Sequence, residues 1–236
     1  MNRFFAVFVF VLFLLSNTVF AEDKNDLKSA VRIVTDHGIG SGTVFVEDEF
    51  YYYILTCGHL HSIKDHVVAY GLVKIDFFDD DEFKLRIYGD FIRSEVNIEK
   101  RIDLAIIRFG KAAVHGYNIN ILKLAPEDTI IKKGQTIHST GFPFGNWPMS
   151  WGGKIDTVFE KMVAFSPNPF SGQSGSSIRN TDDLIIGVIV YSVNTITNNG
   201  RPQYMGTNGY SLGNGGAISL KAIYQFLKEN KINVKL

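Results

Sequence analysis

After residue 29 the chain is dominated by short runs of β-branched and aromatic residues, and this feature restricts the possible folds more than any other. Val, Ile, Tyr and Phe are enriched in strands because they pack well on a pleated, half-buried surface. Glycines and clusters of acidic or Asn residues separate the runs, as expected for turns. The runs lie at residues 30–35, 42–46, 51–56, 67–73, 83–88, 104–109, 135–140, 154–165 and 184–191. Many short strands separated by turns predict an all-β sandwich or barrel.

One segment near the C-terminus has a helical period instead. Its apolar residues recur on one face of a helix with 3.6 residues per turn: Leu220, Ile223, Tyr224 and Leu227. Ser219 stands before them as an N-cap, because its hydroxyl can accept a hydrogen bond from a free N–H of the first turn. We expect a single amphipathic helix over residues 219–230.

The composition is that of an ordinary globular protein without a strong net charge. The chain has 236 residues, of which 45% are hydrophobic and 20% charged, enough for a sizeable core in one large or two small domains. Lys plus Arg and Asp plus Glu number 24 each. No overall field therefore attracts nucleic acid or anionic lipid, and we expect no nucleic-acid partner.

Residues 1–21 have the pattern of a secretory signal peptide. Arg3 gives a positive start, residues 4–15 form an unbroken apolar run of 12 residues, and Ala21 is a small residue at the expected cleavage site. A run of this length is too short to cross a bilayer comfortably. We expect a secreted or periplasmic mature chain, residues 22–236, without stable membrane association. The alternative is an uncleaved membrane anchor.

Three short motifs supply the residue types of nucleophilic catalysis, in the order His, Asp, Ser. His59 ends the motif Thr-Cys-Gly-His, Asp103 opens an apolar segment, and Ser174 lies in Gly-Gln-Ser-Gly-Ser-Ser. A serine hydroxyl is a weak nucleophile that needs an adjacent base, and histidine titrates near neutral pH. An acid behind the imidazole sets its tautomer and stabilises the imidazolium. We assign His59, Asp103 and Ser174 as a catalytic triad.

The glycines around Ser174 allow a sharp turn that points backbone N–H groups at one spot. The N–H groups of Gly172 and Ser174 are therefore predicted to form an oxyanion hole. The neighbouring serines at 171, 176 and 177 lack this arrangement of glycines. Asp76, Asp90 and the acidic run 79–82 are weaker candidates for the acid that orients the histidine.

Cys57 is the only cysteine, so no intramolecular disulfide can form even though export is expected. We interpret it as a small core residue. The competing interpretation, a cysteine nucleophile, is disfavoured because Cys57 lies two residues from His59, beside the base rather than facing it.

Together these motifs resemble the trypsin-like serine peptidases, and most closely the compact bacterial Do-like and glutamyl-endopeptidase-like group. Further matches are Gly-Ser-Gly-Thr at residues 40–43, a Gly-x-Pro-x-Gly turn at 141–145 and Gly-Ala-Ile at 216–218 before the helix. The intervals of 44 and 71 residues between the three triad residues also suit the compact members. The resemblance spans residues 29–230.

This resemblance implies two packed six-stranded antiparallel β-barrels with a C-terminal α-helix. The first barrel is expected over residues 29–125, the second over 126–218 and the helix over 219–230, with no PDZ domain after it. The implied function is that of a serine endopeptidase, which hydrolyses peptide bonds of a protein or peptide substrate through an acyl-enzyme intermediate. The resemblance implies neither a cofactor nor a metal ion.

By the same resemblance, the pocket for the side chain before the scissile bond is formed by Asn168, Val190, Tyr191 and Ser192. Asn168 lies six residues before the nucleophile, where trypsin has an aspartate that selects basic side chains. Its neutral amide does not support a strong Lys or Arg preference. Glutamyl endopeptidases place a histidine on the later strand, but this chain has none after His138. We expect a small to medium apolar pocket.

Trypsin relatives that mature by cleavage insert a new N-terminus, which orders the oxyanion loop. Here the residues from 22 to 29 are few and mostly polar or charged, and burying such a segment would be costly. We expect the loop 167–174 to be ordered instead by Phe165 and Phe170 packing into the core.

Two other functions and one metal site remain as alternatives. The first function is a non-catalytic binding module that keeps the peptidase fold. The second is an esterase or acyl transferase, although the motif is not a Gly-x-Ser-x-Gly elbow and βαβ alternation is lacking. The acidic run 79–82 is interpreted as a solvated loop, with calcium binding as the alternative. We expect His61 and His66 at the surface.

Overall fold

The computed structural model describes residues 27–61, 71–79, 82–97, 99–196, 202–204 and 215–232. For residues 191–196 and 202–204 it describes the backbone only. The predicted signal peptide and His66 lie outside the described residues. Among the residues described, no helix is both long and apolar enough to cross a membrane.

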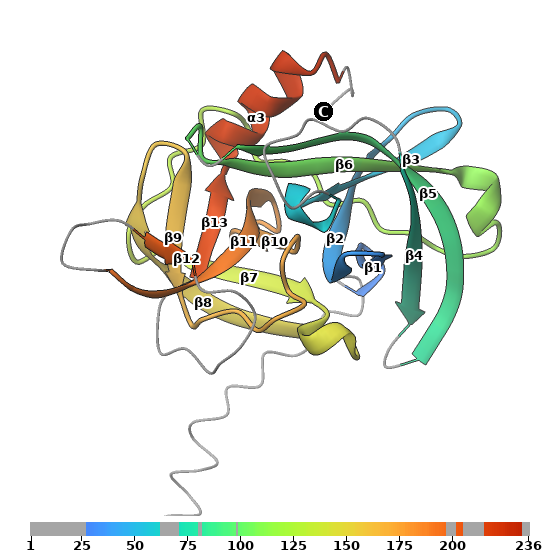
Figure 1. Ribbon diagram of the computed structural model, residues 1–236, viewed down its shortest axis with the longest axis horizontal. Helices are drawn as coiled ribbons and strands as arrows, with labels where there is room; N and C mark the ends of the chain where they lie inside the picture. Colours follow the sequence, from blue (N-terminus) through green and yellow to red (C-terminus); the bar gives the residue numbers. More distant parts are fainter. Residues whose placement is uncertain are drawn as a thin grey trace, which may run out of the picture.

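Six antiparallel strands close the first barrel in the order β1-β2-β3-β6-β5-β4. They are β1 (Ala30–Thr35), β2 (Gly38–Glu47), β3 (Tyr51–Thr56), β4 (Leu72–Asp79), β5 (Glu82–Asn97) and β6 (Ile102–Gly110). Every strand pairs with two neighbours, so the closed barrel leaves no strand edge unpaired within the sheet. In Figure 1 this barrel is drawn in blue to green.

The second barrel follows the order β10-β7-β8-β9-β13-β11 and is closed by pairing of β10 with β11, while β12 extends β11 at one side. Its strands are β7 (Thr136–Gly141), β8 (Met149–Val158), β9 (Met162–Ser166), β10 (Ser177–Arg179), β11 (Ile185–Ile196), β12 (Pro202–Tyr204) and β13 (Gly215–Ser219). The two six-stranded barrels confirm the predicted fold class. They lie side by side in Figure 1.

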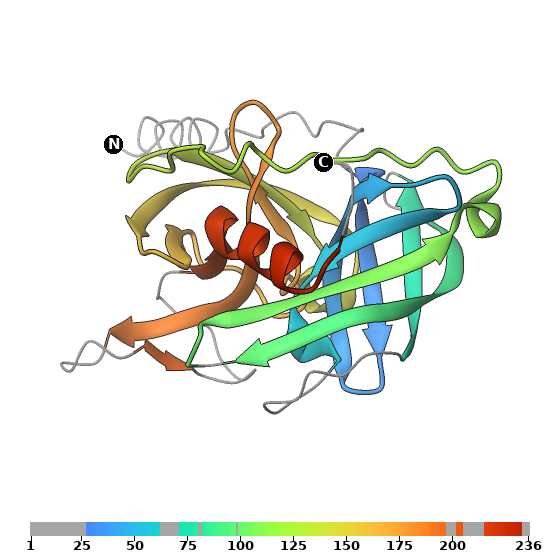
Figure 2. The ribbon, with the colours of Figure 1, turned by 90° about the horizontal axis from the view of Figure 1, so that it is seen from above.

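Helix α3 (Leu220–Glu229) follows β13 directly. Ser219 caps it as predicted, because its side chain accepts a hydrogen bond from Ala222 N. The buried residues of α3 join one hydrophobic core that also includes residues of both barrels. Figure 2 shows α3 against the barrels from above.

Residues 111–135 connect the two barrels, and the predicted division at residue 125 falls in this segment. It begins with the 3-10 helix η2 (Lys111–Val114). Leu122 N donates to Val44 O of the first barrel at 3.0 Å, and Ala125 N donates to Ile185 O of the second at 2.9 Å. The connection is therefore hydrogen-bonded to both barrels and fixes their relative position.

Several strand predictions need correction. The run 154–165 is two strands, because β8 ends at Val158 and β9 begins at Met162. The turn between them contains no Gly, Pro or Asn, so no turn signal marks it. Strand β5 extends to Asn97, well past the predicted end at residue 88. A register shift between Phe91 and Arg93 interrupts its pairing with β6, and bulges of this kind let a long strand bend.

Candidate active site

The register of two strands brings His59 and Asp103 together. Thr56 at the end of β3 pairs with Ala105 on β6, so Asp103 extends past the end of β3, where the chain turns into η1 (Gly58–Leu60). His59 Nδ1 lies 2.7 Å from Asp103 Oδ2, and the backbone N of His59 donates to Asp103 Oδ1 at 2.8 Å. One carboxylate therefore holds both the ring and the backbone of His59.

The environment of His59 favours its charged form. Burial disfavours a charged imidazole, but the neighbouring Cys57 sulfur and the Asp103 carboxylate act in the opposite sense and raise the pKa of His59 well above its usual value. Burial also raises the pKa of the Cys57 thiol. Since a protonated thiol carries no charge, we attribute the raised pKa of His59 to Asp103.

Cys57 is a core residue, as predicted, with no exposed surface. Its sulfur nevertheless reaches the imidazole, because Cys57 Sγ lies 3.5 Å from His59 Nε2. The sequence-based expectation that Cys57 stands beside the base and does not face it is therefore wrong in this respect. Its burial and its raised pKa leave little reactive thiolate.

Ser174 is half-buried in the loop of residues 167–176, which we call the serine loop. Gly172 and Gly175 have φ angles of +88° and +90°, a conformation that favours glycine. Added Cβ atoms would lie 2.4 Å from Phe142 O at Gly172 and 2.0 Å from Ser41 O at Gly175. The glycines around Ser174 are therefore needed both for the backbone conformation and for the space.

The first barrel contacts the serine loop through Ser41 on β2. Ser41 N donates to Ser174 O at 2.8 Å, and Ser41 Oγ donates to Gly172 O at 2.7 Å. Thr56, three residues before His59, donates to Ser41 O at 2.6 Å. Ser41 on β2 and Thr56 at the end of β3 therefore link the loop of Ser174 to the segment of His59.

The backbone N–H groups of Gly172 and Ser174 in the serine loop donate to no acceptor among the described residues. The N–H groups around them are used, because Gln173 N donates to Phe170 O at 3.1 Å and Gly175 N donates to Ile189 O at 2.7 Å. The two donors predicted to bind an oxyanion are thus both available.

His59 and Ser174 are not joined by a hydrogen bond in the described part of the chain. The structure therefore pairs the base with the acid, but not the base with the nucleophile. Catalytic hydrogen bonds are often long in the absence of substrate and tighten in the substrate complex.

The predicted substrate pocket is described only in part. Asn168 is half-buried in the serine loop, and Val190 on β11 is buried with 5% of its surface exposed. The side chains of Tyr191 and Ser192 lie outside the described residues. Their backbone pairs with Gly216 and Gly215 of β13.

Other expectations change with the structure. His61 is half-buried, with its ring stacked on Phe91 at a centroid distance of 4.3 Å, so its surface assignment is wrong. Phe165 is buried in the core as predicted, whereas Phe170 is 45% exposed and packs on Phe144. Within the described ranges, no three His, Cys, Asp or Glu side chains form a metal-binding group.

Asp76, a weaker sequence candidate for the orienting acid, has a different set of partners. It is fully buried, and its carboxylate accepts hydrogen bonds from Arg32 at 2.8 Å and Arg86 at 2.6 Å. The sequence reasoning missed this cluster. The only available signal was an arginine at position 32 inside an otherwise apolar strand.

Comparison with known proteins identifies the family. The model of the trypsin-like peptidase domain matches residues 40–188, a range that includes His59, Asp103 and Ser174. No curated protein matches the sequence at a significant level.

Solved structures share the fold at low sequence identity. The serine endoprotease from Yersinia pestis is 16% identical with a TM-score of 0.60, covering 89% of this chain and 65% of its own. The HtrA-type protease AlgW, solved with a tripeptide, is 18% identical with a TM-score of 0.61, covering 89% and 62%. The MamO protease domain from Magnetospirillum magneticum is 13% identical with a TM-score of 0.56, covering 86% and 97%.

The chain thus spans less than two thirds of the length of two of these proteins. The family match agrees with the observed pair of barrels and with the enzyme class predicted from the sequence, that of the serine proteases. On this basis, the chain belongs to the trypsin-like peptidase domain family.

Proposed function

We propose that this protein is a serine endopeptidase that uses His59, Asp103 and Ser174 as its catalytic triad. The observation that carries the proposal is the Asp103 carboxylate, which binds both His59 Nδ1 and the His59 backbone. This bond keeps the proton on Nδ1, so that Nε2, which lies 3.5 Å from Cys57 Sγ, is the ring nitrogen that acts as the base. A histidine with only a structural role would not need this orientation.

In the proposed reaction, Ser174 Oγ attacks the carbonyl carbon of the scissile peptide bond while His59 Nε2 accepts the hydroxyl proton. His59 then donates that proton to the departing amine, and the acyl group stays on Ser174. Water, deprotonated by His59, attacks the acyl-enzyme and releases the carboxylic acid product. The Asp103 carboxylate stabilises the imidazolium that forms in both halves of the reaction.

The N–H groups of Gly172 and Ser174 are proposed to bind the oxyanion of the tetrahedral intermediates. Their lack of an acceptor among the described residues supports this role, because preorganised donors in an oxyanion hole usually give the largest single contribution to catalysis. A small to medium apolar first-subsite pocket containing Asn168 and Val190 is part of the same proposal. So is export of the chain after removal of residues 1–21.

A second candidate function is a non-catalytic binding module with the peptidase fold. The specific observation in its favour is that no hydrogen bond links His59 to Ser174 in the described part of the chain. The complete set of triad residue types argues against it, because loss of catalysis would remove the need to keep all three.

A fluorophosphonate probe separates the two functions. We expect it to phosphonylate Ser174 of the mature protein, with modification mapped by peptide mass spectrometry, and Ser174→Ala to abolish labelling without loss of the folded state. Ser171→Ala and Cys57→Ala serve as controls, since Ser171 is an exposed serine in the same loop and Cys57 is the competing nucleophile. Both controls should still be labelled. Labelling of Ser174→Ala at the wild-type rate would overturn the assignment.

A further inference from the structure

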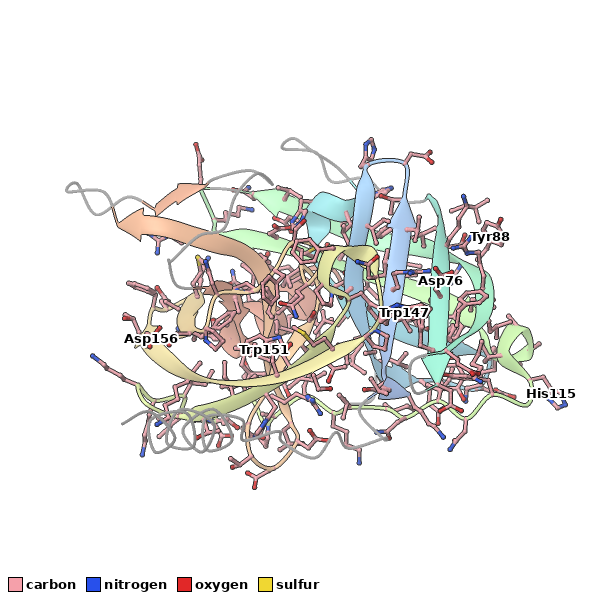
Figure 3. All side chains as sticks on the ribbon, turned by 90° about the horizontal axis from the view of Figure 1, so that it is seen from below. Asp76, Tyr88, His115, Trp147, Trp151 and Asp156 are labelled. Atoms are coloured by element: carbon pink, nitrogen blue, oxygen red, sulfur yellow. The ribbon has the colours of Figure 1, made fainter. Side chains whose placement is uncertain are left out.

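An arginine of the first barrel reaches the turn that supports the serine loop of the second. Arg32 lies on β1, and its Nη1 donates to Gly145 O at 2.8 Å and to Asn146 O at 3.4 Å. Both carbonyls belong to residues 142–146, which contain the short helix η3 (Pro143–Gly145) and which we call the η3 turn. Figure 3, which labels Asp76 and Trp147, shows this side of the molecule.

The guanidinium of Arg32 is itself held in place. Its Nε and Nη2 donate to Asp76 Oδ2 at 3.0 and 2.8 Å, and Asp76 is fully buried. The guanidinium carbon also lies 4.8 Å from the centre of the Phe78 ring. Because the guanidinium is planar, bonds on its Nε and Nη2 side set the direction in which Nη1 points. Asp76 therefore aims Arg32 at the η3 turn.

The η3 turn has a backbone conformation that its surroundings must maintain. Phe144 has a φ angle of +55°, which is unfavourable for a bulky side chain and persists only where neighbouring contacts hold it. Arg32 binds the carbonyls of the next two residues, Gly145 and Asn146. Together with Ser41 Oγ, which accepts a hydrogen bond from Phe142 N at 2.9 Å, these contacts hold the turn from the side of the first barrel.

The strained residue holds the peptide group that carries an oxyanion donor. Phe144 N donates to Ser171 O at 2.5 Å. Ser171 O and Gly172 N belong to one planar trans peptide, in which the C=O and N–H bonds point in opposite directions. Holding the carbonyl against Phe144 thus points the Gly172 N–H away from the η3 turn, and this N–H is one of the two donors proposed to bind the oxyanion.

We propose that Arg32 is a positioning residue for catalysis, which sets the direction of the Gly172 N–H from the first barrel through the η3 turn. The inference rests on the proposed peptidase function. Beside the bonds from Ser41, it assigns to Arg32 and Asp76 a part in ordering the serine loop, which sequence reasoning had given to Phe165 and Phe170.

Arg86 offers a matched control. It donates to the same Asp76 carboxylate at 2.6 and 2.9 Å, but no hydrogen bond from it to the η3 turn occurs among the described residues. We expect Arg32→Gln to lower kcat on a peptide substrate by about 10- to 100-fold, because a misplacement of about 1 Å can cost ~10²-fold. KM should change by less than about threefold, since the donor acts mainly in the transition state. Arg86→Gln should keep kcat within about twofold of the wild-type value. This change in activation free energy is well below the ~1.36 kcal/mol that corresponds to a tenfold change in rate.

A second variant covers the case in which Arg32→Gln does not fold. Arg32→Lys keeps a positive charge beside Asp76 but lacks the fork that binds Asp76 and Gly145 together. We expect it to melt near the wild-type temperature and still to lose kcat. A folded Arg32→Lys protein with wild-type kcat would overturn the proposal, and so would equal kcat losses in Arg32→Gln and Arg86→Gln.

Inhibitor binding gives a readout that a general loss of stability does not move. A peptide boronate places an oxygen in the oxyanion hole, whereas the corresponding peptide binds Ser174→Ala without forming an oxyanion. Arg32→Lys should weaken boronate inhibition by the same factor as kcat/KM. In the Ser174→Ala background, Arg32→Lys should leave peptide affinity unchanged.

If the wild-type protein neither cleaves peptides nor binds the boronate, the proposed function itself fails. An active wild type with unaltered Arg32 variants refutes only the role of Arg32.

Discussion

In the first barrel the candidate catalytic groups are held by a carboxylate side chain, whereas in the second barrel they are held by backbone hydrogen bonds. Asp103 binds His59 directly at 2.7 and 2.8 Å. The serine loop instead depends on glycines at positive φ and on bonds from Ser41 and Phe144. The two halves should therefore respond differently to substitution: the first to loss of a side chain, and the second to addition of one.

The strongest test removes the base. His59→Ala should lower kcat by about 10⁴- to 10⁶-fold, because the members of a catalytic triad act as a unit. The measurement is steady-state cleavage of one peptide, with the folded state checked by circular dichroism. The double variant His59→Ala, Ser174→Ala should lose almost nothing more. Additive losses would show that the two residues do not act together.

Replacing the acid should have the next largest effect. Asp103→Asn should lower kcat by about 10⁴-fold, since the amide no longer selects the productive tautomer. It should also move the acid limb of kcat/KM to lower pH, because Asp103 raises the pKa of His59.

The pH profile supplies the sign of this effect. Only neutral His59 accepts a proton, so the wild-type activity should fall as the pH drops through the raised pKa, and its acid limb should lie above the ordinary histidine value of about 6.5. The contribution of the pair to stability has the opposite trend: it is fully present below the unfolded pKa and is lost as the pH rises through the folded one. An acid limb that does not move in Asp103→Asn would contradict the assigned cause of the shift.

In the second barrel, adding a single methyl group at Gly172 should be enough to impair catalysis. Its Cβ in Gly172→Ala would lie 2.4 Å from Phe142 O, at a φ of +88°, so the donor peptide must shift. Loss of one oxyanion donor costs about 10²- to 10³-fold in kcat. Gly116→Ala is the matched control, because Gly116 has a φ of +84° but nothing within 4 Å of an added Cβ. It should cost stability, by about 1–3 kcal/mol, without changing kcat.

A feature of this structure could be predicted from the sequence where neighbouring residues mark it, and could not where it depends on residues far apart in the chain. β1 and β3 match the predicted runs end for end, because short apolar strands bounded by turn residues carry their own signal. The break between β8 and β9 could not be found, since residues 159–161 lack turn residues. The pairing of His59 with Asp103 could be predicted, because the motifs that contain His59, Asp103 and Ser174 follow one another in the order of a catalytic triad. Arg32 contacts the η3 turn through the main-chain carbonyl of Gly145, which is 113 residues away along the chain. No local motif marks such a contact.

The smallest effect is expected at the N-terminus. Deleting residues 22–26, which lie outside the described residues, should leave kcat/KM within about threefold of the wild-type value, a barrier change of about 0.65 kcal/mol. The serine loop already has contacts that order it, from Ser41 and from the η3 turn. Before the nucleophile stands Gln173, which is buried and whose Oε1 accepts a hydrogen bond from Phe170 N at 2.8 Å. Its neutral amide offers no charge to pair with an inserted ammonium group.

The deletion ends before Leu27 because that side chain is buried, with 3% of its surface exposed, and its removal would test packing instead of control. Kinetics of the truncated protein and of Arg32→Lys on one peptide decide between two ways of ordering the loop. If the truncation costs as much activity as Arg32→Lys or more, the N-terminus takes part in the active site. The N-terminus would then have to be added to the contacts from the two barrels that order the serine loop.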